Sequence, residues 1–232
     1  MLPVATVLLI GASRGIGFEL ASQFIEQGWR VIATARSDEG LERLANLGAQ
    51  VHRMDVAQPT SNTGLAWYLD GEKIDLAIYV AGVIDRAGAL TPPSLNTFDA
   101  VMHTNVMGAM QVIPQIVPMV QETGGVIACI SSAMGSLQDT TSGGAALYRV
   151  SKAALNMVVR CTQAELPDIT VLALHPGWVQ TDMGGANAPL TPEQSATSLR
   201  QTLSRIVAER KTEQRRAYRG AFLNHDGQPL PW

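Results

Sequence analysis

Short apolar runs recur along the chain and alternate with longer segments of mixed apolar and polar positions. Several of these runs are apolar almost throughout, which is typical of strands buried on both faces of a parallel sheet. The predicted strands are Thr6–Ile10, Arg30–Thr34, Gln50–Arg53, Leu76–Val80, Gly125–Ile130 and Thr170–Leu174.

Between the strands, the apolar positions follow helical spacing. The predicted helices are Gly15–Gln27, Leu41–Leu47, Thr60–Leu69, Thr97–Gln121 and Tyr148–Glu165. A late helix is predicted after Thr191, where a proline in the first turn and Gln194 at the capping-box position mark an N-terminus. This alternation predicts an α/β fold, a doubly wound parallel sheet flanked by helices on both faces. No repeat or linker divides the chain, so residues 1–232 are predicted to form a single domain.

Composition narrows the class of protein. With 46% hydrophobic and 16% charged residues, disorder is excluded as the dominant state. With a net charge of −3, the chain lacks the excess of positive charge that is typical of nucleic-acid-binding proteins. Residues 200–219 hold seven Arg or Lys and two Glu. This segment is interpreted as a solvated helix end and loop, with a polyanion-binding patch as the alternative.

Neither a signal peptide nor a membrane span is predicted. Val4–Ile10 follows no basic segment and fits a strand, while Val106–Val120 is interrupted by prolines and glutamines. We therefore expect a soluble, cytoplasmic protein. Cys129 and Cys161 both lie in apolar runs and are predicted to be buried, reduced thiols.

A glycine-rich turn follows the first predicted strand and leads into a helix. Glycines let the backbone approach an anion, while the free N–H groups at the start of the helix bind it. At this place in an α/β pattern, the turn indicates a dinucleotide site, with a plain packing turn as the alternative. The candidate residues are Gly11, Ser13, Arg14, Gly15, Ile16 and Gly17.

The end of the second strand bears on the choice of dinucleotide. Arg36 stands near where an acid would bind the adenosine ribose, and Arg14 could approach the same place. Two guanidinium groups there suit the 2′-phosphate of NADP. Alternatively, both are surface arginines and Asp38 is the ribose acid, so NAD(H) stays open. Asp55, after the third strand, is either an acceptor for the adenine amino group or a turn residue.

Tyr148 and Lys152 are four residues apart at the start of a predicted helix, so they share one face. A nearby ammonium stabilises phenolate, which should lower the pKa of the tyrosine toward the range of acid–base catalysis. Ser132 follows the fifth strand, at the sheet edge where chemistry is expected, and could polarise a substrate carbonyl. Ser131 is its rival, and Ser132 could instead be only a capping residue.

Taken together and in this order, the motifs resemble those of the short-chain dehydrogenase/reductase family over essentially the whole chain. The resemblance rests on Gly11-x-x-x-Gly15-x-Gly17, Asn105, Ser132, Tyr148-x-x-x-Lys152 and Pro176-Gly177. It implies a Rossmann-like sheet and hydride transfer between a nicotinamide cofactor and a carbonyl or alcohol. Tyr148 would be the general acid, and Lys152 would bind the nicotinamide ribose and tune Tyr148. Ser132 would orient the substrate oxygen, while Asn105 would hold the helix kink and a water of the proton relay.

The same resemblance implies further residues beside the cofactor: Val56, Ala81, Gly82, Pro176, Gly177, Val179 and Thr181. The stretches 174–185 and 220–232 look like the C-factor (C-signal) and sniffer-type carbonyl reductase branch, which implies NADP-linked carbonyl reduction or a signalling role. One departure is Tyr79-Val80-Ala81-Gly82, where the family usually has Asn-Asn-Ala-Gly. In the family these asparagines make hydrogen bonds on the adenine side and within the sheet, and this chain lacks both side chains.

The leading hypothesis is an NADPH-dependent reductase of a small carbonyl compound. One alternative is a cofactor-binding signalling protein with little catalysis. Another is a methyltransferase on a similar sheet, which leaves Tyr148 and Lys152 unexplained. The four histidines lack metal-ligand spacing, so no metal site is predicted. A homodimer or homotetramer, formed through the helices at 106–121 and 148–165, is a further expectation from the resemblance.

Overall fold

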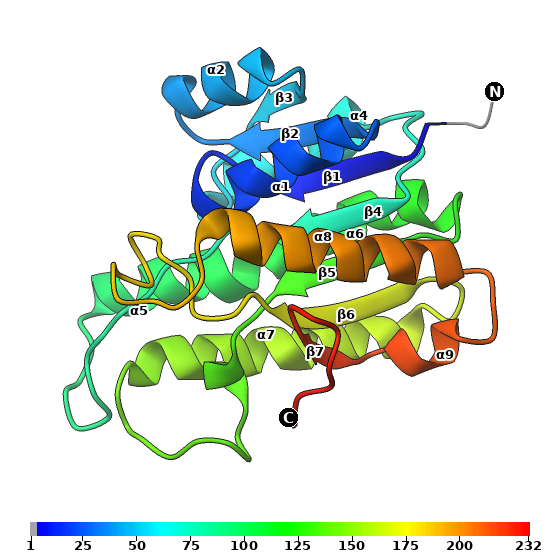
Figure 1. Ribbon diagram of the computed structural model, residues 1–232. Helices are drawn as coiled ribbons and strands as arrows, with labels where there is room; N and C mark the ends of the chain where they lie inside the picture. Colours follow the sequence, from blue (N-terminus) through cyan, green and yellow to red (C-terminus); the bar gives the residue numbers. More distant parts are fainter. Residues whose placement is uncertain (1–3) are drawn as a thin grey trace.

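The computed structural model describes residues 4–232 and contains one seven-stranded sheet (Figure 1). The strands are β1 (Thr6–Ile10), β2 (Arg30–Ala35), β3 (Gln50–Arg53), β4 (Leu76–Tyr79), β5 (Val126–Ile130), β6 (Thr170–His175) and β7 (Phe222–Asn224). They pair in the order β3-β2-β1-β4-β5-β6-β7, and every pair is parallel. The predicted doubly wound sheet is confirmed. Only β7 went unpredicted, because three residues are too few to show a periodicity.

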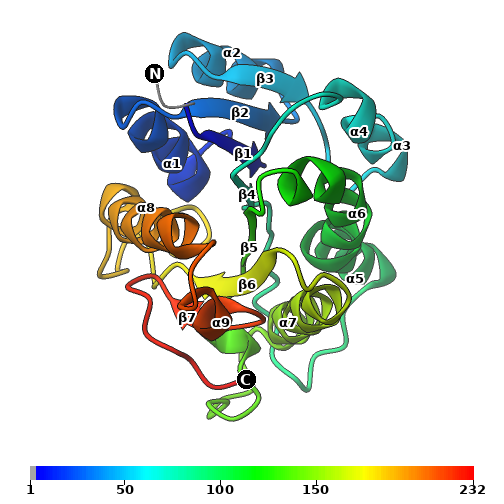
Figure 2. The ribbon, with the colours of Figure 1, turned by 90° about the vertical axis from the view of Figure 1, so that its right-hand side faces the viewer.

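Helices cover both faces of this sheet (Figure 2). They are α1 (Gly15–Glu26), α2 (Asp38–Asn46), α3 (Pro59–Asn62), α4 (Leu65–Tyr68), α5 (Leu95–Met102), α6 (Gly108–Gln121), α7 (Ala146–Glu165), α8 (Pro192–Glu209) and α9 (Arg215–Tyr218). Buried residues of α1, α2 and α8 pack on one face, and those of α4, α6 and α7 pack on the other. The layered arrangement follows from strands that are apolar on both sides.

Two of the predicted helices are divided in the structure. The segment predicted at 60–69 forms the short helices α3 and α4. The segment predicted at 97–121 is interrupted by a π-helical turn, His103–Met107, between α5 and α6. Apolar periodicity reveals such a turn poorly, because one extra residue shifts the pattern by about 100°, close to the width of a single apolar face.

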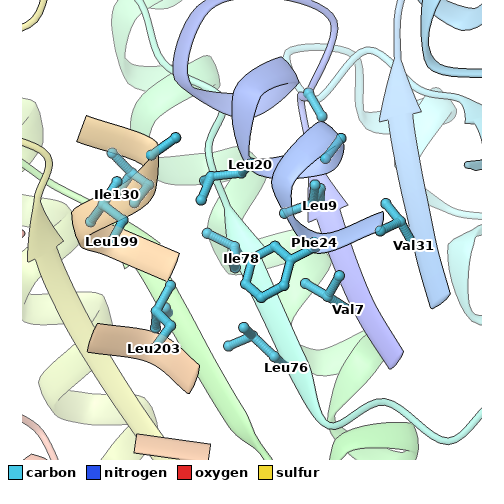
Figure 3. Packing of buried hydrophobic residues seen from close by; sticks show 14 of the residues in the cluster. Val7, Leu9, Leu20, Phe24, Val31, Leu76, Ile78, Ile130, Leu199 and Leu203 are labelled. Atoms are coloured by element: carbon cyan, nitrogen blue, oxygen red, sulfur yellow. The ribbon is translucent and has the colours of Figure 1, made fainter. Parts of the chain in front are cut away.

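The core between the sheet and the α1–α8 layer is made of branched aliphatic side chains around one aromatic ring. Phe24 of α1 lies against the strand residues Val7 and Leu76, while Leu199 and Leu203 of α8 complete the cluster (Figure 3). This packing holds helix α1, which follows the glycine-rich turn, against the sheet.

The two cysteines differ in burial. Cys129 on β5 is fully buried, as predicted, but Cys161 is exposed, so that prediction was wrong. The reason is helical geometry. Leu155, Val159 and Gln163 form the buried face of α7, and Cys161 lies two residues from this face, on the solvent side.

The basic segment at 200–219 continues α8 to Glu209 and then forms α9, where a loop was expected. Arg210 pairs with Asp75 at 2.7 Å, and Arg216 pairs with Glu213 at 3.3 Å. No helix within residues 4–232 has the length and apolar character needed to cross a membrane.

Candidate active site

A cavity of about 430 Å³ opens where the carboxyl ends of the strands meet. It lies beside β1 and β4, where the strand order reverses, which is the usual ligand site of an open α/β sheet. Its lining includes Gly11, Ser13, Arg14, Gly15, Ile16, Gly17, Arg36, Asp55, Val56, Ala81, Gly82, Tyr148, Lys152, Pro176, Gln180, Thr181, Asp182 and Met183. Most of the predicted cofactor residues are therefore together.

The glycine-rich turn leaves no room for side chains. A Cβ on Gly11 would lie 2.7 Å from the Cβ of Ala81, and one on Gly17 would lie 2.8 Å from the Cα of Ala12. Gly11 also has a φ of +84°, a conformation that favours glycine. Helix α1 begins directly after this turn, with no side-chain cap and no acid in its first turn. Its free N–H groups face the cavity as a phosphate cradle should.

The two arginines predicted near the 2′-phosphate both line the cavity, from different elements. Arg14, in the glycine turn, pairs with Asp182, and both side chains are exposed. Arg36 follows β2, and its carbonyl accepts a 2.9 Å hydrogen bond from Arg53 Nη1. Arg53 also pairs with Asp38, which does not line the cavity. The charge of Asp38 is thus already matched by an arginine outside the cavity.

Asp55 is a turn residue that also lines the cavity. Its Oδ1 accepts a 3.1 Å hydrogen bond from Ala57 N, and its own N–H donates to Ser61 Oγ at 2.9 Å, so it shapes the turn after β3. It also lines the cavity, next to Val56. The turn therefore places a carboxylate at the wall of the cavity.

Ser132, Tyr148 and Lys152 converge at the end of β5. Ser132 follows the strand, and its Oγ accepts a 3.1 Å hydrogen bond from Met134 N. Tyr148 and Lys152 lie on the buried face of α7, with Lys152 Nζ 5.7 Å from the centre of the phenol ring. The rival Ser131 lines the cavity, whereas Ser132 does not. The Ser131 hydroxyl is already bonded, because it donates to Asn156 Oδ1 at 2.6 Å.

Burial controls the protonation of this cluster. It raises the pKa of Tyr148, and a hydrogen bond with Ser132 lowers that pKa only in part. The expectation that Lys152 lowers the pKa of Tyr148 was wrong, because burial dominates and raises that pKa. Burial also lowers the pKa of Lys152 to about 8, with the nearby Cys129 acting in the opposite direction. Lys152 Nζ donates to the Ile130 carbonyl at 2.8 Å. At neutral pH Tyr148 therefore keeps its proton, as a general acid must.

Asn105 lies behind the cavity, fully buried in the π turn. Its Oδ1 accepts from Val83 N at 2.8 Å, while its Nδ2 donates to the Val83 carbonyl at 2.8 Å and to Ser151 Oγ at 2.9 Å. The amide thus joins the loop after β4 to helix α7.

The segment after β6 closes one side of the cavity. Pro176 and Thr181 line it, whereas Gly177 and Val179 do not, although both were predicted beside the cofactor. Val179 is buried, where it bridges to Leu190. His175, interpreted from sequence as structural, is largely buried, and burial lowers its pKa to about 4.

Sequence reasoning missed Gln180, Asp182 and Met183, which also line the cavity. Their position after β6 was the only available signal, since the carboxyl ends of parallel strands share one edge. Met183 is linked to the loop after β4, because its carbonyl accepts a 2.6 Å hydrogen bond from Arg86 Nη2.

The loop at 136–145 also runs beside the loop after β4, with Ala89 N donating to the Gly143 carbonyl at 3.0 Å.

Comparison with known proteins extends over the whole chain. Residues 5–190 match the family model described as short chain dehydrogenase. The chain is 34% identical over 240 residues to the 1-hydroxy-2-glutathionyl-2-methyl-3-butene dehydrogenase of a Rhodococcus strain, covering 99% of this chain and 100% of that protein. It is 36% identical over 164 residues to the C-signal protein of Myxococcus xanthus, covering 68% and 93% respectively.

Solved structures show the same similarity. A short-chain dehydrogenase/reductase from Burkholderia multivorans with bound NADP is 32% identical, with a TM-score of 0.87. The carbonyl reductase Sniffer of D. melanogaster is 27% identical, with a TM-score of 0.86. Each comparison covers 99% of this chain and 100% of the other.

Proposed function

Because this chain belongs to the short chain dehydrogenase family of oxidoreductases, we propose that it is an NADPH-dependent reductase of aldehydes, ketones or quinones. The observation that carries the proposal is that Tyr148 and Lys152 line the cavity, with Ser132 hydrogen-bonded to Tyr148, close to a turn whose glycines leave space for a dinucleotide phosphate. The structural similarity to an NADP complex and to a carbonyl reductase supports it.

In this mechanism, bound NADPH would supply the hydride that forms the new C–H bond at the carbonyl carbon. Ser132 Oγ donates a hydrogen bond to the carbonyl oxygen and holds it beside Tyr148. The Tyr148 hydroxyl transfers its proton to that oxygen as negative charge develops, which completes the alcohol. The positive charge of Lys152 stabilises the phenolate left behind. Asn105 holds the loop after β4 in place beside helix α7 through hydrogen bonds to both.

The residues present fit NADPH better than NADH. Arg36 and Arg14 line the cavity near the end of β2, Ala35 takes the place of an acid, and Asp38 is paired with Arg53. A guanidinium binds a phosphate through paired, charge-assisted hydrogen bonds. We expect the adenosine 2′-phosphate to compete with Asp182 for Arg14.

This assignment predicts the effect of R36D. The KM for NADPH should rise about tenfold or more, because attraction to the 2′-phosphate becomes repulsion, while the KM for NADH should change little. Steady-state kinetics with both cofactors measure this. R43D is a matched control, since Arg43 is exposed on α2 and outside the cavity. Equal changes for the two cofactors in R36D would refute the assignment.

The proposed activity is tested by following cofactor oxidation with a panel of aldehydes, ketones and quinones, with NADPH and NADH in parallel. Turnover with NADPH on at least one carbonyl class is expected. A second candidate function, a cofactor-binding signalling protein, is favoured by the similarity to C-signal. Tight NADPH binding without turnover across the panel would contradict the reductase and support this second function.

We also propose self-association through α5, α6 and α7. Phe98, Met110 and Met157 are apolar side chains exposed on these helices, which lie next to one another on one side of the sheet (Figure 2). Sedimentation velocity would show a dimer or tetramer, and M157E should shift the protein toward the monomer. A wild-type monomer at high concentration would contradict this.

A further inference from the structure

A side chain of the sheet, that of Tyr79, is hydrogen-bonded to the π turn that carries Asn105. Tyr79 lies on β4 in register with Cys129 of β5, and it is 2% exposed. Its hydroxyl donates a 2.7 Å hydrogen bond to the carbonyl of Thr104, the residue directly before Asn105. A π turn departs from the regular helical hydrogen-bond pattern, so a fixed external partner can hold it in place.

The chain makes room for this contact at Gly108, where α6 begins. A Cβ at Gly108 would lie 2.4 Å from the Tyr79 hydroxyl oxygen and 2.9 Å from the Val56 carbonyl oxygen. The Gly108 N–H also donates to the His103 carbonyl, which closes the π turn. The absence of a side chain at this position therefore lets the phenol reach the Thr104 carbonyl.

Tyr79 has no direct contact with the reacting groups. It does not line the cavity, and burial raises its pKa, so its hydroxyl remains a proton donor to Thr104 at any physiological pH. It stands at the first position of the Tyr-Val-Ala-Gly sequence, where the family usually has asparagine. We infer that Tyr79 is a positioning residue: its hydroxyl fixes the π turn, and the π turn fixes Asn105.

Two sets of contacts connect Asn105 to the proposed catalytic groups, Lys152 and Tyr148. This part of the inference rests on the proposed function. Asn105 binds both the N–H and the carbonyl of Val83. The preceding residue, Gly82, lies close to Lys152: a Cβ added to Gly82 would be 3.4 Å from Lys152 Nζ. Asn105 also binds Ser151, whose hydroxyl donates to the Tyr148 carbonyl at 2.7 Å. A shift of Asn105 would therefore move the loop and the helix that flank Lys152 and Tyr148.

The test is Y79F, which removes one oxygen and keeps the buried ring. We expect kcat for carbonyl reduction to fall about tenfold while the KM for NADPH stays within about twofold, because positioning and not binding is lost. Y218F is the matched control. It also removes a bonded hydroxyl, which donates to Glu209 at 2.7 Å far from the cavity, and it should keep the wild-type kcat.

A second readout does not depend on activity. In Y79F the Val83 amide, which donates to Asn105 Oδ1, should exchange with deuterium about tenfold faster by NMR, while Y218F leaves it unchanged. G108A, which displaces the Tyr79 hydroxyl, should reproduce both effects. An unchanged Val83 exchange rate, or a wild-type kcat, in Y79F would overturn the inference. If the wild type reduces no carbonyl, the proposed function fails, while Val83 exchange still decides whether Tyr79 positions Asn105.

Discussion

At the scale of single residues, the proposed chemistry depends on two buried side chains that burial affects in opposite ways. Tyr148 holds its proton more firmly than a free tyrosine, and Lys152 holds its proton less firmly than a free lysine. The sequence predicts that these residues meet, because a spacing of four places them on one helical face. It does not predict how deeply they are buried, because that depends on packing from distant segments.

Burial of Lys152 predicts how stability depends on pH. Its pKa falls from an ordinary 10.5 to about 8 on folding. Below pH 8 Lys152 is protonated in the folded protein, and burial of its ammonium group lowers the free energy of unfolding by the full amount. Between pH 8 and 10.5 the unfolded chain binds more protons, so stability should rise with pH through this window. Urea unfolding at pH 7 and 9.5 should show the wild type gaining stability relative to K152M.

The control for this prediction is K73M, which removes a lysine whose side chain is 74% exposed. Between pH 7 and 9.5 the wild type should gain more stability relative to K152M than relative to K73M. If the free energies of unfolding of K152M and the wild type differ by the same amount at both pH values, the lowered pKa of Lys152 is contradicted.

At the scale of elements, local patterns predict regular structure well and irregular structure poorly. Six strands and the start of α8 follow from apolar runs and capping residues. The π turn depends on Tyr79 of β4, which is distant in sequence, and so it has no local signature. The pairs Arg14–Asp182 and Arg53–Asp38 escape prediction for the same reason, since each joins separate elements.

The capping box of α8 gives a prediction at this scale. Thr191 Oγ accepts a 3.2 Å hydrogen bond from Gln194 N, and Gln194 Oε1 accepts one of 2.9 Å from Thr191 N. T191A should lower the free energy of unfolding by about 1 kcal/mol, whereas T191S should stay near the wild type. Urea unfolding monitored by circular dichroism measures both. Equal stability of T191A and the wild type would show that the cap contributes nothing.

At the scale of the whole molecule, the cavity receives residues from Gly11 to Met183, so it depends on most of the sheet being assembled. The order of motifs along the chain predicts this, because the glycine-rich turn, Ser132 and Pro176 each follow a different strand. The single domain predicted for residues 1–232 stays a prediction. The sequence does not reveal which long-range contacts connect the elements at the amino ends of the strands, opposite the cavity.

One such contact joins the end of α8 to the start of β4. Arg210 pairs with Asp75 at 2.7 Å, and Asp75 Oδ2 accepts from Thr6 N at 2.9 Å. Both side chains of the pair are mostly buried. R210A should lower the free energy of unfolding by about 2 kcal/mol, because a largely buried carboxylate loses its partner. R216A, which breaks the exposed pair with Glu213, should cost less than about 0.5 kcal/mol in the same urea titration.

The central claim, that Tyr148 is the proton donor of a carbonyl reductase, is tested most directly by single-turnover reduction in Y148F. With a carbonyl that the wild type reduces, the rate should fall about 10³-fold, while NADPH binds within about threefold of the wild-type Kd. Y218F should match the wild type in both. Reduction by Y148F at the wild-type rate would contradict the account.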